Sequence, residues 1–320
     1  MRRLLDTPAG RPLGVTSAVM LAALVAAAIG LIVDPRVITG APAWLKPAKF
    51  AISMAVYCST LLWLLSFVRG HTRFVRGVAW VTAVTLLVEE TIIVGQVVRG
   101  VPSHFNVSTP LDSTLFSIMG STIVIAWVAG LVAAILLLRQ RMADSVFGWA
   151  LRLGLLISLV GMSLGFLMTN ANPSQELAAN VRAQAGLPIT SGAHSVGVPA
   201  GDGGAGLPIV GWSTEGGDLR APHFVGIHAI NVLALIGWAL SRSRLRRSAR
   251  LGLVWTASLG YLSLVALLAW QALREQSLAA PDGLTLAAAG VLLATFSVAT
   301  VAILASPTRG GATTQPGPAS

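Results

Sequence analysis

The chain has 320 residues, of which 54% are hydrophobic and only 11% are charged. In soluble domains roughly a quarter of all residues are charged, so this composition excludes an ordinary soluble globular protein. A net charge of +10 would suggest binding to nucleic acid in a soluble protein. In a membrane protein, basic residues in the loops determine how the helices are oriented, so we expect no nucleic-acid partner. The single cysteine, Cys58, excludes an internal disulfide and a thiolate metal cluster.

Long apolar runs recur along the whole chain, and each is near the ~20 residues that a helix needs to cross a bilayer. In chain order they predict membrane-spanning helices at residues 13–33, 48–68, 77–98, 115–138, 147–168, 223–240, 251–271 and 284–304. We therefore predict an all-α, polytopic transmembrane bundle of eight helices within residues 1–305. Residues 169–221 form the one long loop, which is rich in glycine, and residues 306–320 are expected to be a disordered tail.

The basic residues predict how the bundle is oriented. Eight spans place both termini on one side, and the lysines and arginines then divide into fifteen on that side and seven on the other. Because positive residues accumulate in cytoplasmic loops, we expect both termini inside and the loop 169–221 outside. The chain has only two lysines, with much alanine and glycine, which is typical of a GC-rich bacterium. We therefore predict a protein of the bacterial plasma membrane, with the lipid bilayer as its partner, and leave the oligomeric state open.

Unusual polar residues collect toward the predicted outer side, in the stretches 46–50, 99–106 and 217–224. From the helix rise, Glu89 lies about 13 Å below the outer end of its span, His228 about 8 Å and Asn231 about 12 Å. Ionisable groups inside a membrane are costly and normally face protein or a wet cavity. These levels overlap, so we predict an outward-open polar pocket among the second, third, fourth and sixth spans.

The histidines of this region suggest a metal. His104, His223 and His228 are predicted as ligands of a transition metal such as zinc or iron, with Glu89 as general base or fourth ligand. His223 and His228 are five residues apart, so they do not form the usual i, i+4 clamp of a helix. Haem b is the alternative cofactor, with His228 and either His104 or His223 as axial ligands.

The remaining polar residues are predicted to bind a small-molecule or lipid-like ligand. Lys46, Lys49 and Arg220 are expected to hold an anionic group. Two other interpretations stay open: the lysines are anchors beside Trp44 at the headgroup level, and the arginines close the outer face in a structural network with aspartates. The other predicted ligand-binding residues are Gln96, Arg99, Asn106, Asp218 and Asn231.

Three motifs resemble those of a family of uncharacterised bacterial multi-pass membrane proteins. They are Lys-Pro-Ala-Lys-Phe at 46–50, Arg-Gly-Val-Pro-Ser-His-Phe-Asn at 99–106, and Gly-Asp-Leu-Arg-Ala-Pro-His-Phe at 217–224 followed by His228. The resemblance covers the second to sixth spans. It implies an integral membrane protein and no particular activity. Intramembrane zinc hydrolases related to alkaline ceramidases differ at the decisive point, because the spacing of His223 and His228 is not theirs.

Three functional hypotheses follow from these residues. The first is a metal-dependent membrane enzyme that acts on an amphipathic or lipid-like substrate at the outer face. The second is a proton-coupled transporter of a small molecule or ion, with Glu89 as proton carrier. The inner halves of the predicted helices are almost wholly apolar, which counts against transport. The third is a haem-binding or structural membrane protein.

Overall fold

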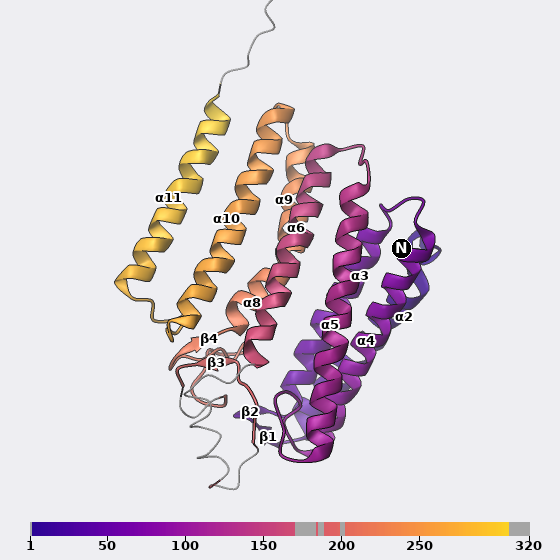
Figure 1. Cartoon of the computed structure of the whole chain (residues 1–320), viewed down its shortest axis with the longest axis vertical. Helices are drawn as coiled ribbons and strands as arrows, with labels where there is room; N and C mark the ends of the chain where they lie inside the picture. The colour runs from indigo at the N-terminus through magenta and orange to yellow at the C-terminus, as the bar shows by residue number, and fades with distance from the viewer. Residues whose placement is uncertain (1, 170–183, 185–188, 199–201, 307–320) are drawn as a thin grey trace, which may run out of the picture.

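The computed structural model describes residues 2–169, 184, 189–198 and 202–306, so the expected tail beyond residue 306 lies outside the described residues. Within this part of the chain, eight helices are long and apolar enough to cross a membrane (Figure 1). The prediction of an all-α, polytopic bundle with eight spans is therefore confirmed, and the chain is an integral membrane protein.

The spans begin and end within a few residues of the predicted limits. A short helix, α1 (Arg2–Leu5), precedes them. The helices of the bundle are α2 (Gly10–Val33), α3 (Leu45–Leu65), α4 (Thr72–Arg99), α5 (Pro110–Arg139), α6 (Ser145–Leu164) continued by the 3-10 helix η1 (Gly165–Thr169), α8 (Arg220–Ile227), α9 (Ala229–Arg242), α10 (Arg247–Leu273) and α11 (Gly283–Ala305). The sixth span consists of two helices, α8 and α9.

Local capping residues fix several helix ends. The side chain of Thr109 accepts a hydrogen bond from the Asp112 amide at the start of α5. Asp144 and Asp282 do the same for the first turns of α6 and α11. Gly100 ends α4 with a φ of 74°, a left-handed conformation that glycine adopts without strain. These caps satisfy backbone groups that a helix end leaves open.

The helices follow one another across the bundle. The first four spans, α2 to α5, pack together, and their buried apolar side chains form the main core with α6. Helix α6 carries α8 and α9 on its other side, α10 packs against α6, α8 and α9, and α11 packs against α10 at the edge (Figure 1). Helices α4 and α9 therefore lie in different halves of the bundle.

The break in the sixth span is closed by a serine from a neighbouring helix. At His228 the chain leaves α8 and starts α9, and the Asn231 amide pairs with the His228 carbonyl. Ser158 of α6 donates to the Ile227 carbonyl at 2.9 Å and accepts from the Ile230 amide at 3.0 Å. A membrane provides no water for such freed groups, so this hydroxyl permits the break.

Close contact between two glycines holds α8 against α6. A Cβ atom on Gly161 would lie 2.3 Å from the carbonyl carbon of Gly226, so neither position accommodates a side chain without movement. Small residues are typical of helix contacts in membranes because they let backbones approach. Gly226 lies two residues before His228, so the contact fixes α8 on α6 close to the break.

The described parts of the long loop cover one end of the bundle, which the sequence predicts to be the outer end. Strand β3 (Ser195–Val196) pairs with β4 (Gly217–Asp218), and residues 106 and 190 form an antiparallel bridge. A second small sheet, β1 (Val37–Ile38) with β2 (Ala41–Pro42), lies at the same end of the molecule (Figure 1). Beneath the loop, Phe105, Met168, Val196, Leu219 and Ala272 form a small apolar cluster.

Candidate functional site

A buried carboxylate and an imidazole meet at the outer part of α4. Glu89 lies ten residues before the end of the helix, about 15 Å along its axis. Its side chain is 1% exposed, and Oε1 is 3.3 Å from Nε2 of His104. Oε2 has no hydrogen-bond partner among the described residues. Glu89 is therefore enclosed, and the recess that the sequence predicts to be outward-open is closed in this structure.

His104 connects Glu89 to a hydroxyl. Ser103 Oγ lies 3.1 Å from Nδ1 of His104, and the ring of Phe50 lies against the imidazole. Burial lowers the pKa of His104 well below its ordinary value, and the nearby charge of Lys46 lowers it further. A neutral imidazole has one N–H. Both contacts are satisfied when Ser103 donates its hydroxyl hydrogen to Nδ1 of His104 and the N–H of Nε2 donates to Glu89.

This order of groups also resembles that of a nucleophile, a base and an orienting carboxylate. However, Ser103 is 5% exposed and directly precedes His104 in the chain. The hydroxyl therefore points inward rather than toward a space that would admit a substrate. The arrangement is better matched to moving a proton between Glu89 and its neighbours than to acyl transfer.

The external loop brings a second imidazole–carboxylate pair to this site. His194 Nδ1 lies 2.5 Å from Oδ2 of Asp202, which also accepts from the backbone amides of His194 and Ser195. Burial opposes ionisation of Asp202, but the charge and hydrogen bonds of His194 outweigh it and hold the pKa of Asp202 below its ordinary range. The ring of Phe105 separates the two histidines, at 5.0 Å from His194 and 6.0 Å from His104.

Ser103, His194 and Asp202 are not among the residues predicted from the sequence. His194 and Asp202 lie in a glycine-rich loop without helical or strand periodicity, so nothing in the sequence places them over Glu89. Ser103 is adjacent to a predicted ligand, and that adjacency is the one signal that could have identified it.

Two predicted ligand-binding residues of α4 are engaged in a structural network instead of lining a cavity. Gln96 donates to Asp112 at 2.9 Å and accepts from Arg99, and Arg99 forms an ion pair with Asp112 at 2.6 Å. This network joins the outer ends of α4 and α5. Asn106 donates to the Pro102 carbonyl and accepts from Ser108, so it holds the connecting loop in shape.

The predicted residues of the third stretch also have protein partners. Arg220 forms an ion pair with Asp218 at 2.5 Å and donates to the Gly211 carbonyl. Lys49 donates to the Val210 carbonyl at 3.0 Å, which ties α3 to the external loop. Asn231 donates to Thr60 of α3 at 3.0 Å and so links α9 to that helix. The alternative of a network that closes the outer face therefore fits Arg99, Asp218 and Arg220.

The predicted metal site is not formed. Among the described residues, no three histidine, cysteine, aspartate or glutamate side chains lie close enough to hold a metal ion. His104 contacts Glu89, whereas Nδ1 of His223 is 2.8 Å from the Gly161 carbonyl of α6. His228 caps α9 at the helix break, beside the ring of Phe224. The structure does not support this grouping, because α8 and α9, which carry two of the three histidines, pack on α6 and α10.

Haem b, the alternative cofactor, needs an axial imidazole with a free ring nitrogen. Both ring nitrogens of His104 have partners, Ser103 and Glu89, whereas His223 uses only Nδ1, which lies against the Gly161 carbonyl. His104 is therefore poorly placed as an axial ligand, and haem ligation by His223 or His228 stays a prediction.

Buried polar groups continue inward along α4. Thr85 and Thr82 lie four and seven residues before Glu89 and share its helix face. Both are buried, and the hydroxyl of Thr82 has no hydrogen-bond partner among the described residues. Glu90 is also buried, with both oxygens unpaired in this part of the chain. From Thr82 to Gln96 the polar groups extend about 21 Å along the helix. Helix α4 therefore carries buried polar groups beyond the level of Glu89, although we expected this part of the helices to be almost wholly apolar.

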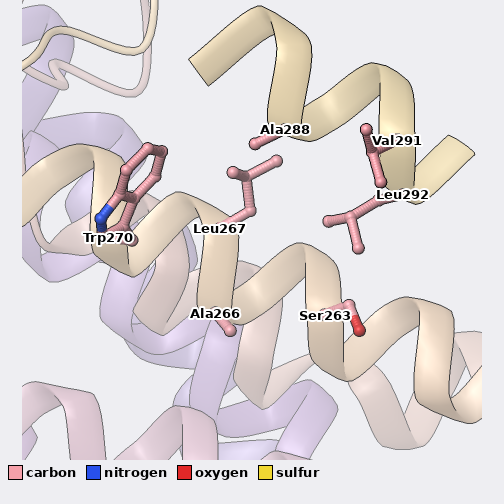
Figure 2. Close-up of a pocket in the computed structure, with 7 residues that line it drawn as sticks. All are labelled: Ser263, Ala266, Leu267, Trp270, Ala288, Val291 and Leu292. Carbon is pink, nitrogen blue, oxygen red and sulfur yellow. The ribbon is translucent and has the colours of Figure 1, made fainter. Parts of the chain in front are cut away.

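A groove of about 490 Å³ lies elsewhere, between α10 and α11. Figure 2 shows Leu267 and Trp270 of α10 facing Ala288, Val291 and Leu292 of α11. Its lining has one hydroxyl, that of Ser263, and no ionisable side chain. The groove is therefore a hydrocarbon-lined surface and does not contain the acid–base groups described above.

Comparisons of this chain with protein families, curated proteins and solved structures find no match.

Proposed function

We propose that this protein is a proton-coupled transporter of a small solute, in which Glu89 takes up and releases the proton. The observation that carries the proposal is the enclosed carboxylate of Glu89, with one oxygen on His104 and the other without a partner in the described part of the chain. Ionisable residues at such depth are costly and mark proton relays and ion pathways. The metal-dependent enzyme loses its support because its ligand set does not assemble.

The polar face of α4 supports a path through the membrane. Thr85 and Thr82 continue the line of Glu89 toward the other side, over a large part of the ~30 Å hydrocarbon core. On the predicted outer side, His194 of the loop lies against Phe105, whose ring separates it from His104, the neighbour of Glu89. This arrangement corresponds to an occluded state, and transport requires the loop to open.

Reconstitution tests the proposal directly. The purified protein is placed in liposomes that contain a pH-sensitive dye, and neutral, cationic and anionic small solutes are added outside at equal and at unequal pH. The wild-type protein is expected to move protons only together with one class of solute, and Glu89→Gln is expected to abolish this coupling. Glu275→Gln, which changes an exposed carboxylate at the end of α10, serves as the matched control and should behave as wild type.

Two outcomes would refute transport. One is that wild-type liposomes show no solute-dependent proton movement with any class of solute. The other is that Glu89→Gln and Glu275→Gln have equal coupled flux, because the carboxylate would then carry no proton.

We also propose that the termini lie in the bacterial cytoplasm, on the side with fifteen of the 22 basic residues. Native Cys58 is 0% exposed, so it gives no background to thiol labelling. With a membrane-impermeant maleimide on intact cells, Ile209→Cys, at a position 84% exposed in the external loop, is expected to react at once. Ala143→Cys, in the α5–α6 connection, should react only after permeabilisation, and the reverse pattern would contradict the orientation.

A further inference from the structure

The lysines and arginines of the loop-covered end of the bundle differ in their partners. Each described arginine there forms an ion pair with an aspartate: Arg36 with Asp34, Arg99 with Asp112, Arg220 with Asp218 and Arg274 with Asp282. Lys46 and Lys49 form no ion pair with any described residue, although they are the two lysines of the entire chain. The aspartates Asp34, Asp112, Asp218 and Asp282 are therefore paired with arginines, and neither lysine has an ion-pair partner among the described residues.

The two lysines lie on one face of the first turn of α3. They are three residues apart, which places their side chains on the same side of the helix. The positive end of the helix dipole adds to their charge, and no side chain caps this helix end. Lys46 is half-buried with its ammonium 5.9 Å from the centre of the Phe50 ring, and Lys49 is held by the Val210 carbonyl.

These ammonium groups face charges from three other parts of the fold. Lys46 is attracted by Asp202 of the external loop and by Glu89 of α4, and it is repelled by Arg220 of α8 and by Lys49. Asp202 has fixed partners, because its carboxylate contacts the His194 ring and accepts from the backbone amides of His194 and Ser195. Oε2 of Glu89 is buried and has no hydrogen-bond partner among the described residues, so Glu89 is the neighbouring carboxylate whose charge is not fixed by such contacts.

Other groups around Glu89 do not compete for this role. His104 is the direct neighbour of Glu89, and burial keeps it neutral. Glu90 follows Glu89 on the same helix, and its charge opposes a second negative charge beside it. Asp112 of α5 is compensated by Arg99 at the outer end of α4.

We propose that Lys46 and Lys49 bind a small anion with a carboxylate, phosphate or sulfonate group, and that protonation of Glu89 strengthens this binding. When Glu89 is ionised, its negative charge compensates Lys46 and repels an anion. When Glu89 is protonated, the charge of Lys46 is free for the anion. This inference rests on the proposed function, and it names small anions as the substrate class. Since protonation of Glu89 favours anion binding, a proton and an anion would be transported together.

The site lies between α3 and the external loop, which favours an anion from the aqueous phase. Lys49 is tied to the loop through Val210, and Lys46 is within the electrostatic range of Asp202 on the same loop. A lipid phosphate has the same chemistry, so the experiment distinguishes the two sources.

Equilibrium binding of methanesulfonate to the detergent-purified full chain tests the site, because the charge of this anion is constant over the pH range of interest. Wild type is expected to bind it more tightly at pH 5.5 than at pH 8, a change of about tenfold or more. Lys46→Gln should weaken binding about tenfold to a hundredfold, the range of a charge-assisted contact, whereas Lys46→Arg should retain much of it. Arg244→Gln removes one exposed positive charge near the other end of the bundle and should bind as wild type.

Glu89→Gln tests directly whether Glu89 is the source of the pH dependence. The variant is expected to bind methanesulfonate at pH 8 as tightly as wild type does at pH 5.5, and its affinity should no longer change with pH. A pH dependence that survives in Glu89→Gln would overturn the linkage. Equal binding by Lys46→Gln and Arg244→Gln, or no binding by wild type, would overturn the anion site.

A second arm compares nanodiscs of phosphatidylcholine with nanodiscs that contain phosphatidylglycerol. If the anion comes from water, methanesulfonate binds equally in both kinds of nanodisc. If phosphatidylglycerol displaces it, the lipid headgroup occupies the lysines and the soluble-anion proposal fails.

Binding with the expected pattern but without coupled flux in liposomes would refute the transporter and leave the anion site. Coupled flux that is unaffected by Lys46→Gln would refute the anion site and leave the transporter.

Discussion

The break between α8 and α9 makes Ser158 a sensitive position for stability. Its hydroxyl donates to the Ile227 carbonyl at 2.9 Å and accepts from the Ile230 amide at 3.0 Å, and the side chain is 4% exposed. Ser158→Ala removes both contacts and leaves one buried acceptor and one buried donor unpaired. Each such group costs about 1–3 kcal/mol, so we expect the free energy of unfolding to fall by about 2–6 kcal/mol.

The matched control is Ser163→Ala, one and a half turns further along α6. Ser163 donates to the Leu159 carbonyl of its own helix, which already accepts a helical hydrogen bond, so its loss should cost less than about 0.5 kcal/mol. Reversible unfolding in mixed detergent micelles measures both variants. If the two unfolding free energies differ by less than about 0.5 kcal/mol, water or a rearranged helix satisfies the break and the explanation given for Ser158 is incorrect.

Two further predictions concern the packing and the outer network. Gly161→Ala is expected to destabilise the protein by about 1–3 kcal/mol, because its Cβ atom would overlap the backbone of Gly226, whereas Gly120→Ala has open space and should be neutral or stabilising by up to about 1 kcal/mol. Equal thermal stability of the two variants would contradict the close α6–α8 contact. Arg99→Ala leaves a carboxylate that is 3% exposed and should cost about 2 kcal/mol or more, while Arg36→Ala, at a more exposed pair, should cost about 0–1 kcal/mol in the same unfolding assay. If the two variants lose similar unfolding free energy, the Arg99–Asp112 pair is hydrated and the reasoning from its burial is incorrect.

The sequence determined the membrane architecture of this protein almost completely. Hydropathy is a property of consecutive residues, and the bilayer thickness sets the length of each span, so eight helices follow without knowledge of their packing. The residues that cap the helices are local as well, since Thr109, Asp144, Gly100 and Asp282 act on their own first or last turn. The depth of Glu89 followed from the helix rise alone.

The candidate site was predictable only in part. Glu89 and His104 were both expected near the outer side, and the structure joins them at 3.3 Å. Their grouping with His223 and His228 is not supported, because equal depth in a membrane does not place two helices next to each other. We also predicted one role for the two lysines and the arginines of this end of the bundle, whereas their partners differ.

Only the tertiary structure decided which helices touch and which charges are left unpaired. Lipid chains are as apolar as the helix surfaces, so the hydrophobic effect does not select neighbours inside a membrane. The choice depends on close glycine contacts such as Gly161 with Gly226, and on hydroxyls such as Ser158 that satisfy a broken backbone. It depends equally on a glycine-rich loop that carries His194 and Asp202 from far along the chain to the face of Glu89. These contacts join residues that are distant in sequence, and no local pattern encodes them.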